Sequence, residues 1–134
     1  MATGGSGNIA IAHIGFEKVA GGAATATTLT GPSSGTTGVA STNFTVGANG
    51  AITGTVTVTP ADGGAGGTFT PTTVAISSGT PTATFTYTPA STGVKTISIS
   101  DDGGLTDASS ISYTSNAGSS PKASTVINQF IAGF

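Results

Sequence analysis

The sequence predicts an all-β fold, a sandwich of about seven short strands with an apolar segment at each end of the chain. Residues 81–100 alternate between apolar and polar side chains, as half-buried strands do. Groups of Gly, Pro, Asn and Asp recur at short, regular intervals, which is typical of turns between antiparallel strands. No helical periodicity is found from residue 24 to residue 114. Together these observations favour a β-sandwich.

Residues 81–100 form the unit around which the other strands are expected to pack. The side chains on its apolar face are Ala83, Phe85 and Tyr87 in the first half and Ile97 and Ile99 in the second. Between the halves, Pro89 cannot donate a ladder hydrogen bond and Gly93 tolerates a positive φ. We therefore expect one strand, a corner and a second strand, with the flanking segments covering the apolar face.

Seven strands are predicted in order along the chain. They span residues 24–30, 40–47, 51–59, 68–77, 82–88, 94–100 and 108–114. Asn49-Gly50 predicts a type I′ hairpin between the second and third strands, and Asp62-Gly63-Gly64 and Asp102-Gly103-Gly104 predict further turns. The side chains expected to point inward are Phe44, Val46, Ile52, Val56, Val58, Val74, Ile76, Ile111 and Tyr113. We expect Phe85, Ile97 and Val56 to be buried between the two sheets.

The chain divides into an N-terminal arm at 1–23, a sandwich at 24–115 and a linker with an apolar tail at 116–134. Residues 9–16, IAIAHIGF, are largely apolar on both faces, which favours a buried strand or an arm pressed against a neighbour. In the tail, apolar residues recur at helical spacing, but the segment is short and both helix and strand remain open. The residues predicted to form an assembly interface are Ile9, Ile11, Ile14, Phe16, Val126, Ile127, Phe130, Ile131 and Phe134.

Composition excludes several classes of function. Charged residues make up 6% of the 134 residues, and three lysines form no basic patch, so we expect no nucleic-acid partner. Without Cys there are no disulfides or thiolate metal sites. The N-terminus lacks the basic and long apolar regions of a secretory signal, and no stretch reaches membrane-spanning length. We therefore expect assembly in the cytoplasm and no membrane insertion.

Few residues are candidates for chemistry. His13 is the single imidazole and has only Glu17 nearby in sequence, so we expect a structural or interface role rather than a catalytic triad. Asp101, Asp102 and Asp107 form an oxygen-rich loop whose spacing is not that of an EF-hand; we interpret it as a solvated turn and leave cation binding open. We predict no catalytic, cofactor-binding or metal-binding residues and no cofactor.

Several segments resemble bacterial immunoglobulin-like (Big-type) domains over roughly residues 24–115. They are TLTGP at 28–32, ITGTVTVTPADGG at 52–64, TFTYTPASTGVKTISIS at 84–100 and SSISYT at 109–114. The most specific of these is Y-T-P-x-x-x-G-x-x-T-I, from Tyr87 to Ile97. The resemblance implies a β-sandwich scaffold with an interaction role and no catalytic residues. Such domains occur in surface adhesins, as accessory modules of polysaccharide-active enzymes, and as decorations on phage heads and tails.

The leading expectation for function is a non-enzymatic virion protein, a decoration or accessory subunit of a phage capsid or tail. Its partners would be the major capsid or tail protein, copies of itself in a homo-oligomer, or both. The alternative is a self-assembling extracellular filament, surface-layer or adhesin subunit at the cell surface. An accessory carbohydrate-binding module is a weaker third hypothesis, because the aromatic residues are expected to face inward.

Overall fold

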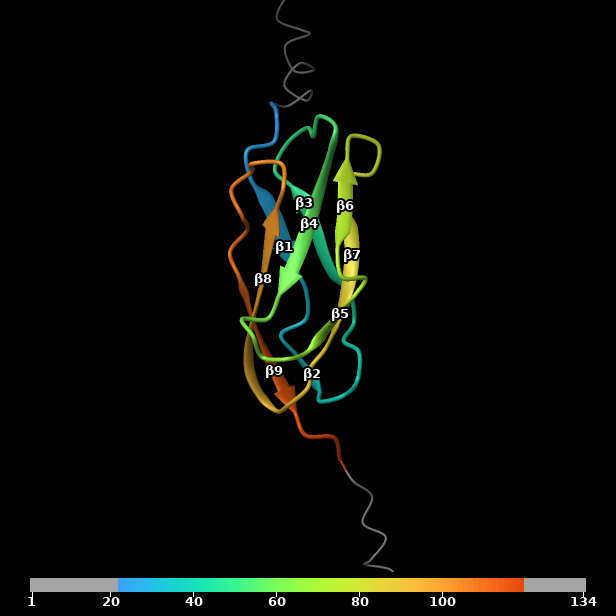
Figure 1. Ribbon diagram of the computed structural model, residues 1–134, viewed down its shortest axis with the longest axis vertical. Helices are drawn as coiled ribbons and strands as arrows, with labels where there is room; N and C mark the ends of the chain where they lie inside the picture. Colours follow the sequence, from blue (N-terminus) through green and yellow to red (C-terminus); the bar gives the residue numbers. More distant parts are fainter. Residues whose placement is uncertain (1–21, 120–134) are drawn as a thin grey trace, which may run out of the picture.

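A computed structural model describes residues 22–119, which form two β-sheets packed face to face (Figure 1). The strands are β1 (Thr27–Thr30), β2 (Ser34–Thr36), β3 (Phe44–Ala48), β4 (Thr55–Ala61), β5 (Thr68–Thr70), β6 (Val74–Ser77), β7 (Ala83–Thr88), β8 (Gly93–Asp101) and β9 (Ile111–Asn116). No helix occurs among these residues, so the described part of the chain has none that is long and apolar enough to cross a membrane.

The strand order is that of an immunoglobulin-like sandwich. One sheet has the order β1-β3-β7-β5 and the other β2-β9-β8-β4-β6. Strands β2 and β9 pair in parallel, and the other pairings between strands are antiparallel. Immunoglobulin domains place strands A, B, E and D opposite C, F and G; here β1, β3, β7 and β5 lie opposite β4, β8 and β9, and β2 and β6 extend the second sheet at its two edges. The predicted all-β sandwich is therefore confirmed, with nine strands where about seven were predicted; the predicted terminal arms lie outside the described residues.

Three strands were not predicted as the structure has them. The segment predicted as one strand at 68–77 is two strands in different sheets, because β5 pairs with β7 while β6 pairs with β4. Pro71 lies between them, and a proline cannot donate to a ladder. The short strand β2 was missed, because its sequence Ser-Gly-Thr has no apolar alternation.

The predicted hairpin at Asn49-Gly50 is wrong. The chain instead passes from β3 in one sheet to β4 in the other. Neither residue has a positive φ, which a type I′ turn requires at both positions. Gly50 is needed for a close approach, because a Cβ there would lie 2.7 Å from the Gly22 carbonyl oxygen.

The unit formed by β7, its corner and β8 is confirmed and joins the two sheets. Gly93 has a φ of 105°, as the corner requires. The Lys95 side chain, only 8% exposed, closes the corner from inside: its Nζ donates to the Thr92 carbonyl oxygen at 2.8 Å and to Ser91 Oγ at 3.2 Å. The sequence analysis did not predict that the Lys95 side chain would be buried.

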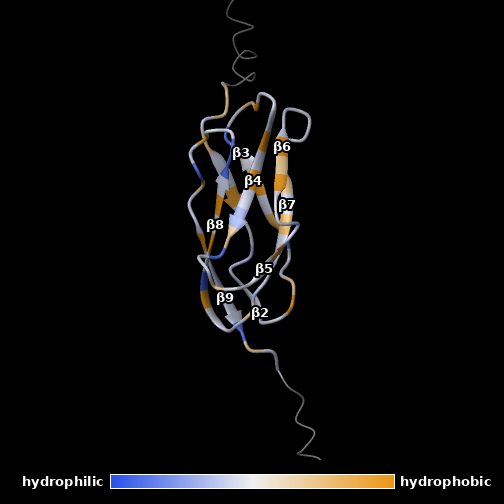
Figure 2. Cartoon of the chain, viewed as in Figure 1, coloured by the Kyte–Doolittle hydropathy of each residue, from blue (hydrophilic) through white to orange (hydrophobic). Residues whose placement is uncertain are grey.

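The core is built from the predicted inward residues. Twelve apolar side chains are buried: Phe44, Val46, Ile52, Val56, Val58, Val74, Ile76, Phe85, Tyr87, Ile97, Ile99 and Tyr113. The Phe44 and Phe85 rings stack at 5.2 Å between centroids, and the Tyr87 and Tyr113 rings meet edge to face at 5.4 Å. Figure 2 marks the apolar residues along β6, β7 and β8. Of the residues predicted to face inward, Ile111 and Ala83 remain partly exposed.

The chain enters and leaves this body at opposite ends of its long axis. Residue 22 lies beside the loop that follows β3, at the upper end in Figure 1, and residue 119 follows β9 at the lower end. We call these ends the N-terminal pole and the C-terminal pole. The predicted arms therefore begin at opposite poles.

Candidate functional site

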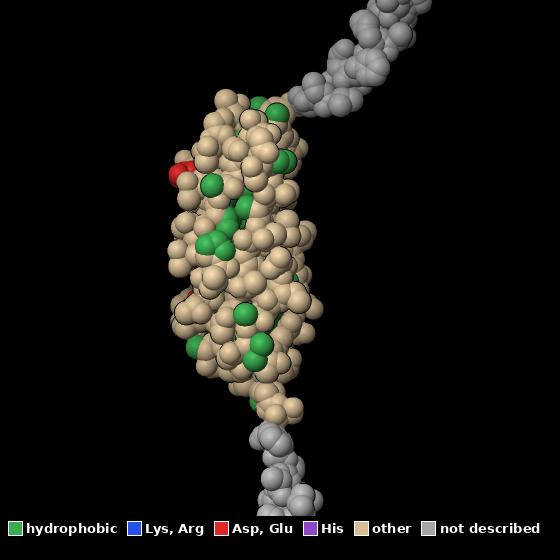
Figure 3. Space-filling model, turned by 90° about the vertical axis from the view of Figure 1, so that its right-hand side faces the viewer, with side chains coloured by type: hydrophobic (Ala, Val, Ile, Leu, Met, Phe, Trp, Pro, Cys, Tyr) green, Lys and Arg blue, Asp and Glu red, His purple; other side chains and the backbone are tan. Residues whose placement is uncertain are grey.

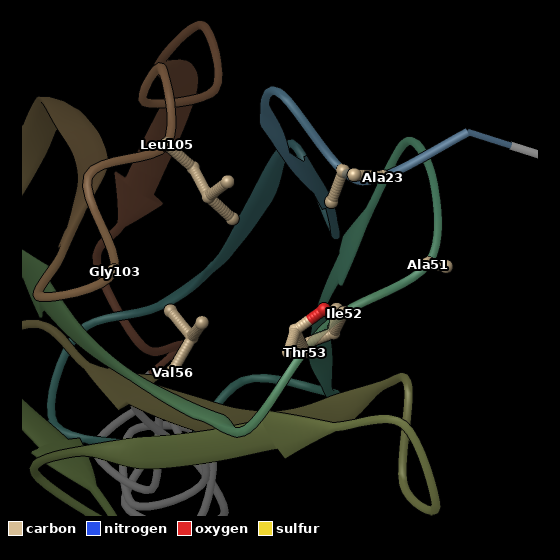
Figure 4. Close-up of a pocket in the computed structure, with 8 residues that line it drawn as sticks. Ala23, Ala51, Ile52, Thr53, Val56, Gly103 and Leu105 are labelled. Carbon is tan, nitrogen blue, oxygen red and sulfur yellow. The ribbon is translucent and has the colours of Figure 1, made fainter.

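A hollow of about 220 Å³ lies at the N-terminal pole (Figure 4). It is lined by Ala23, Ala24, Ala51, Ile52, Thr53, Val56, Gly103 and Leu105. In the close-up, Leu105 and Val56 border it on one side, and Ala23 and Ile52 on the other. Thr53 has the single polar side chain of the lining, and no lining residue is charged. The hollow is therefore suited to an apolar group.

Backbone hydrogen bonds fix the walls of the hollow. The Ala24 N–H donates to the Ala51 carbonyl at 2.8 Å, and the Ala51 N–H donates to the Gly22 carbonyl at 2.9 Å. On the other side, the Thr106 N–H donates to the Thr25 carbonyl at 2.9 Å. These bonds tie the segment before β1 to the loops that follow β3 and β8, so the hollow is preformed.

Asp101 and Asp102 shape the loop beside the hollow. Asp101 Oδ1 accepts hydrogen bonds from the Gly103 N–H at 2.7 Å and the Leu105 N–H at 3.1 Å, while its Oδ2 is buried without a hydrogen-bond partner. Asp102 Oδ1 accepts from the Thr57 N–H at 2.7 Å. Asp107 is exposed, and residues 22–119 contain no group of three or more His, Cys, Asp or Glu side chains placed to hold a metal ion. These contacts support the interpretation of the segment as a turn.

A second polar centre joins the loop after β4 to the core. Asp62 Oδ2 accepts from the Gly67 N–H at 2.7 Å and the Tyr87 hydroxyl at 2.9 Å, and Oδ1 accepts from the N–H groups of Gly64 and Ala65. Burial on its own raises the pKa of Asp62, but these hydrogen bonds outweigh it and hold the pKa below its ordinary value. Burial, and then the hydrogen bond to Asp62, raise the pKa of Tyr87. Because both Asp62 oxygens and the Tyr87 hydroxyl hold the loop after β4 in place, we interpret this polar centre as structural.

The outer faces of the sheets are rich in threonine and poor in charge. One row across β1, β3 and β7 consists of Thr30, Thr45 and Thr84, paired in register. On the side drawn in Figure 3, apolar side chains form small separate patches among backbone and other uncharged side chains, with acidic side chains visible only at one edge. The large apolar side chains exposed on the described body are Val39 at 55% and Val94 at 66%. Isolated residues of this kind are normal on protein surfaces and mark no docking patch.

The structure does not describe most of the residues predicted to form a site. The predicted assembly residues, from Ile9 to Phe16 and from Val126 to Phe134, lie outside residues 22–119, as do His13 and Glu17. The sequence analysis missed the hollow, because its walls come from three segments whose proximity depends on the tertiary fold. The one local signal is Ile52, an apolar residue placed in the crossing between β3 and β4.

The chain matches no protein-family model and no curated protein sequence. Its function is therefore inferred from its fold, its surface and the chemistry of its end segments.

Proposed function

We propose that this protein is a non-enzymatic structural subunit of a phage virion, a capsid or tail decoration or accessory protein anchored through its terminal segments. One observation carries the proposal: the two apolar end segments are attached at opposite poles of a body that has a core of its own among the described residues. The twelve buried apolar residues of that core all lie between residues 44 and 113. We infer that the apolar side chains of the end segments bind a partner.

The end segments are apolar enough to hold a subunit in an assembly. They contain nine large apolar side chains: Ile9, Ile11, Ile14, Phe16, Val126, Ile127, Phe130, Ile131 and Phe134. Burying each contributes roughly 1.5–3 kcal/mol. The loss of translational and rotational freedom on association costs roughly 4–15 kcal/mol. Burial of most of the nine side chains therefore suffices for stable attachment, either to a major capsid or tail protein or to other copies.

The assignment to a virion comes from the resemblance to Big-type domains, which decorate phage heads and tails. It is an analogy at the level of the fold, and folds of this kind serve many functions. The surface of the body fits a scaffold role, because its outward side chains are largely threonine and serine.

Mass spectrometry of gradient-purified virions from the producing host tests the proposal. The protein should be present in a fixed ratio to the major capsid or tail protein. Phe130→Asp should reduce this incorporation strongly, because it places a charge among apolar contacts. Asn128→Asp is the matched control, since it adds the same charge at a polar position of the same tail. Absence of the protein from the particles would overturn the proposal.

A self-assembling extracellular filament or surface-layer subunit is the second candidate, and the opposite poles favour it. A contact between unlike surfaces repeats without closing when its rotation does not form a ring, and it then produces a filament. Electron microscopy of the purified protein alone separates the two functions. Fibres would support self-assembly, whereas monomers or small closed oligomers would support decoration of another particle.

A further inference from the structure

We propose that Asn49-Gly50 is a site of spontaneous deamidation, and that the fold restrains the reaction for as long as residues 22–26, the segment before β1, stay attached to Asn49. Release of this segment starts an irreversible chemical change at the N-terminal pole. This inference goes beyond the proposed function and concerns a modification of the protein itself, whatever its partner.

The sequence Asn-Gly, which occurs once in the chain, contains both groups that the reaction needs. The backbone nitrogen of the glycine attacks Cγ of the asparagine side chain, a C–N bond forms, and Nδ2 leaves as ammonia with the proton of the attacking N–H. Water then opens the cyclic imide at one of its two carbonyls, which gives aspartate or isoaspartate. Asparagine is a thermally labile residue, and glycine has no side chain to shield its nitrogen. Asn49 is exposed, so water reaches it.

Three hydrogen bonds hold the reactive amide of Asn49. Its Oδ1 accepts from the Thr25 N–H at 2.9 Å and the Ala26 N–H at 3.0 Å, and its Nδ2 donates to Thr25 Oγ1 at 2.9 Å. Before it can react, Cγ has to approach the Gly50 nitrogen in an aligned geometry. The amide cannot turn toward Gly50 without breaking these bonds, because both of its terminal atoms are fixed to another segment. The hydrogen bonds therefore slow the reaction.

The backbone on both sides of the reacting nitrogen is bound to the same segment. The Asn49 N–H donates to the Ala26 carbonyl at 3.0 Å, and the Ala51 N–H donates to the Gly22 carbonyl at 2.9 Å. Figure 4 shows Ala51 and Ala23 on the two adjacent segments. Ring closure has to bend the main chain between these bonded residues. Local opening of residues 22–26 would remove both restraints at once.

The fold uses both members of the labile pair. Asn49 supplies an acceptor for two backbone N–H groups and a donor for a hydroxyl. Gly50 is required because a Cβ there would lie 2.7 Å from the Gly22 carbonyl oxygen and 2.9 Å from that of Ala23. These structural requirements explain why a reactive pair stands at this position.

The two products should differ in their effect on the fold. Aspartate keeps an oxygen that accepts from the Thr25 and Ala26 N–H groups, and the Thr25 hydroxyl can donate to the other oxygen. Isoaspartate lengthens the main chain by a methylene group, which displaces Ala51 from its hydrogen bond with Gly22. The isoaspartate product therefore prevents the segment from attaching again.

Mass spectrometry of the full-length protein, incubated at neutral pH, measures deamidation at Asn49. A synthetic peptide of residues 45–54 is the unrestrained reference. We expect the folded protein to react at least about tenfold more slowly than the peptide, which corresponds to about 1.4 kcal/mol on the barrier. Thr25→Val removes the hydroxyl that binds Nδ2 and should accelerate the reaction several-fold. Thr30→Val is the matched control, at an exposed threonine of β1 that pairs with Thr45, and should leave the rate unchanged.

A second measurement needs no variant. Low concentrations of denaturant should accelerate deamidation of the wild-type protein in proportion to hydrogen exchange at the Thr25 and Ala26 amides, because the same opening permits both.

Several outcomes would overturn the proposal. They are an unmodified peptide, a folded protein that reacts as fast as the peptide, a folded Thr25→Val protein with the wild-type rate, and deamidation that stays constant while exchange at residues 25 and 26 rises. None of these measurements involves a virion, so failure of this inference is distinct from failure of the proposed function.

Discussion

Phe85 on β7 lies at the centre of the core, where one side chain accounts for a large share of the stability. It is 1% exposed and contacts the rings of Phe44 and Phe69. Phe85→Ala should lower the free energy of unfolding by about 3–5 kcal/mol, through lost burial and the cavity left behind. Denaturant unfolding measures the change. Thr84→Ala, at the neighbouring outward position, should change it by less than about 0.5 kcal/mol. A loss below about 1 kcal/mol for Phe85→Ala would contradict its central place.

Asp62 should make the protein sensitive to acid. Its pKa lies below the ordinary value of 3.8 in the folded protein, so the carboxylate contributes stability that is fully present above the unfolded pKa. That contribution is lost as pH falls through the folded pKa. The melting temperature should therefore fall as pH drops below about 4. In Asp62→Asn, the melting temperature at neutral pH should be lower and the acid-dependent decrease smaller. An equally steep decrease in the variant would assign the acid sensitivity to other groups.

At the residue scale, the inward side chains could be predicted because strand periodicity is local. Phe85, Ile97 and Val56 are all buried as expected. The pair formed by Asp62 and Tyr87 could not be predicted, since the two residues are 25 positions apart and their hydrogen bond leaves no pattern in sequence. The same is true of the hollow.

Asn49 was predicted to form a hairpin turn, but its side chain instead binds the segment before β1. Its Oδ1 accepts hydrogen bonds from the Thr25 N–H at 2.9 Å and the Ala26 N–H at 3.0 Å, and its Nδ2 donates to Thr25 Oγ1 at 2.9 Å. Asn49→Ala should cost about 0.5–1.5 kcal/mol, because it removes the exposed hydrogen bonds that hold residues 25 and 26. Hydrogen exchange of the Thr25 and Ala26 amides should accelerate. Asn43→Ala, at another exposed asparagine, is the control, and unchanged exchange in Asn49→Ala would contradict this role.

Register explains why no hairpin forms at Asn49-Gly50. A two-residue turn there would pair Val46 with Thr53 and Phe44 with Thr55. The inward residues Val56 and Val58 would then lie on the opposite face of the sheet from Phe44 and Val46. The sandwich avoids this by placing β3 and β4 in facing sheets, so that both apolar sets meet in one core. The hairpin was predicted from the turn residues alone. It is excluded by the positions of the apolar residues, which in a hairpin would lie on opposite faces of the sheet.

Parity also marks the division between β5 and β6. The core side chains in this segment are Phe69, Val74 and Ile76. Phe69 has an odd residue number, whereas Val74 and Ile76 have even numbers, and odd and even residues of one strand face opposite sides. One regular strand cannot point all three to the same side. The change occurs across Pro71, and the two halves pair in different sheets. A prediction from alternation within 68–77 treats the segment as one strand, because only tertiary packing assigns its halves to two layers.

At the scale of the whole molecule, the sandwich could be predicted from strand number and turn spacing, but the placement of its poles could not. The poles depend on which sheet each strand joins, and the crossing between β3 and β4 was predicted as a hairpin. With the observed topology, residues 22 and 119 lie at opposite ends of the long axis. The two arms therefore begin at opposite poles, and the assembly hypothesis has to be tested for each arm separately.

Deletion of residues 124–134 tests the contact at the C-terminal pole. The truncated protein should keep its melting temperature, because the proposal assigns the tail to a partner and residues 44–113 supply twelve buried apolar side chains without it. It should fail to join its particle or oligomer, because the deletion removes five large apolar side chains: Val126, Ile127, Phe130, Ile131 and Phe134. Calorimetry and co-sedimentation measure the two properties.

Attachment of the full-length protein should weaken little between low and high salt, since with 6% charged residues it has few charges for ions to screen. Strong loss of binding in salt would indicate an electrostatic contact instead. The tail would belong to the core if the truncated protein unfolded or aggregated while the full-length chain remained a stable monomer. In that case its apolar side chains would be covering the sandwich itself, and attachment to a partner would have to depend on the N-terminal arm.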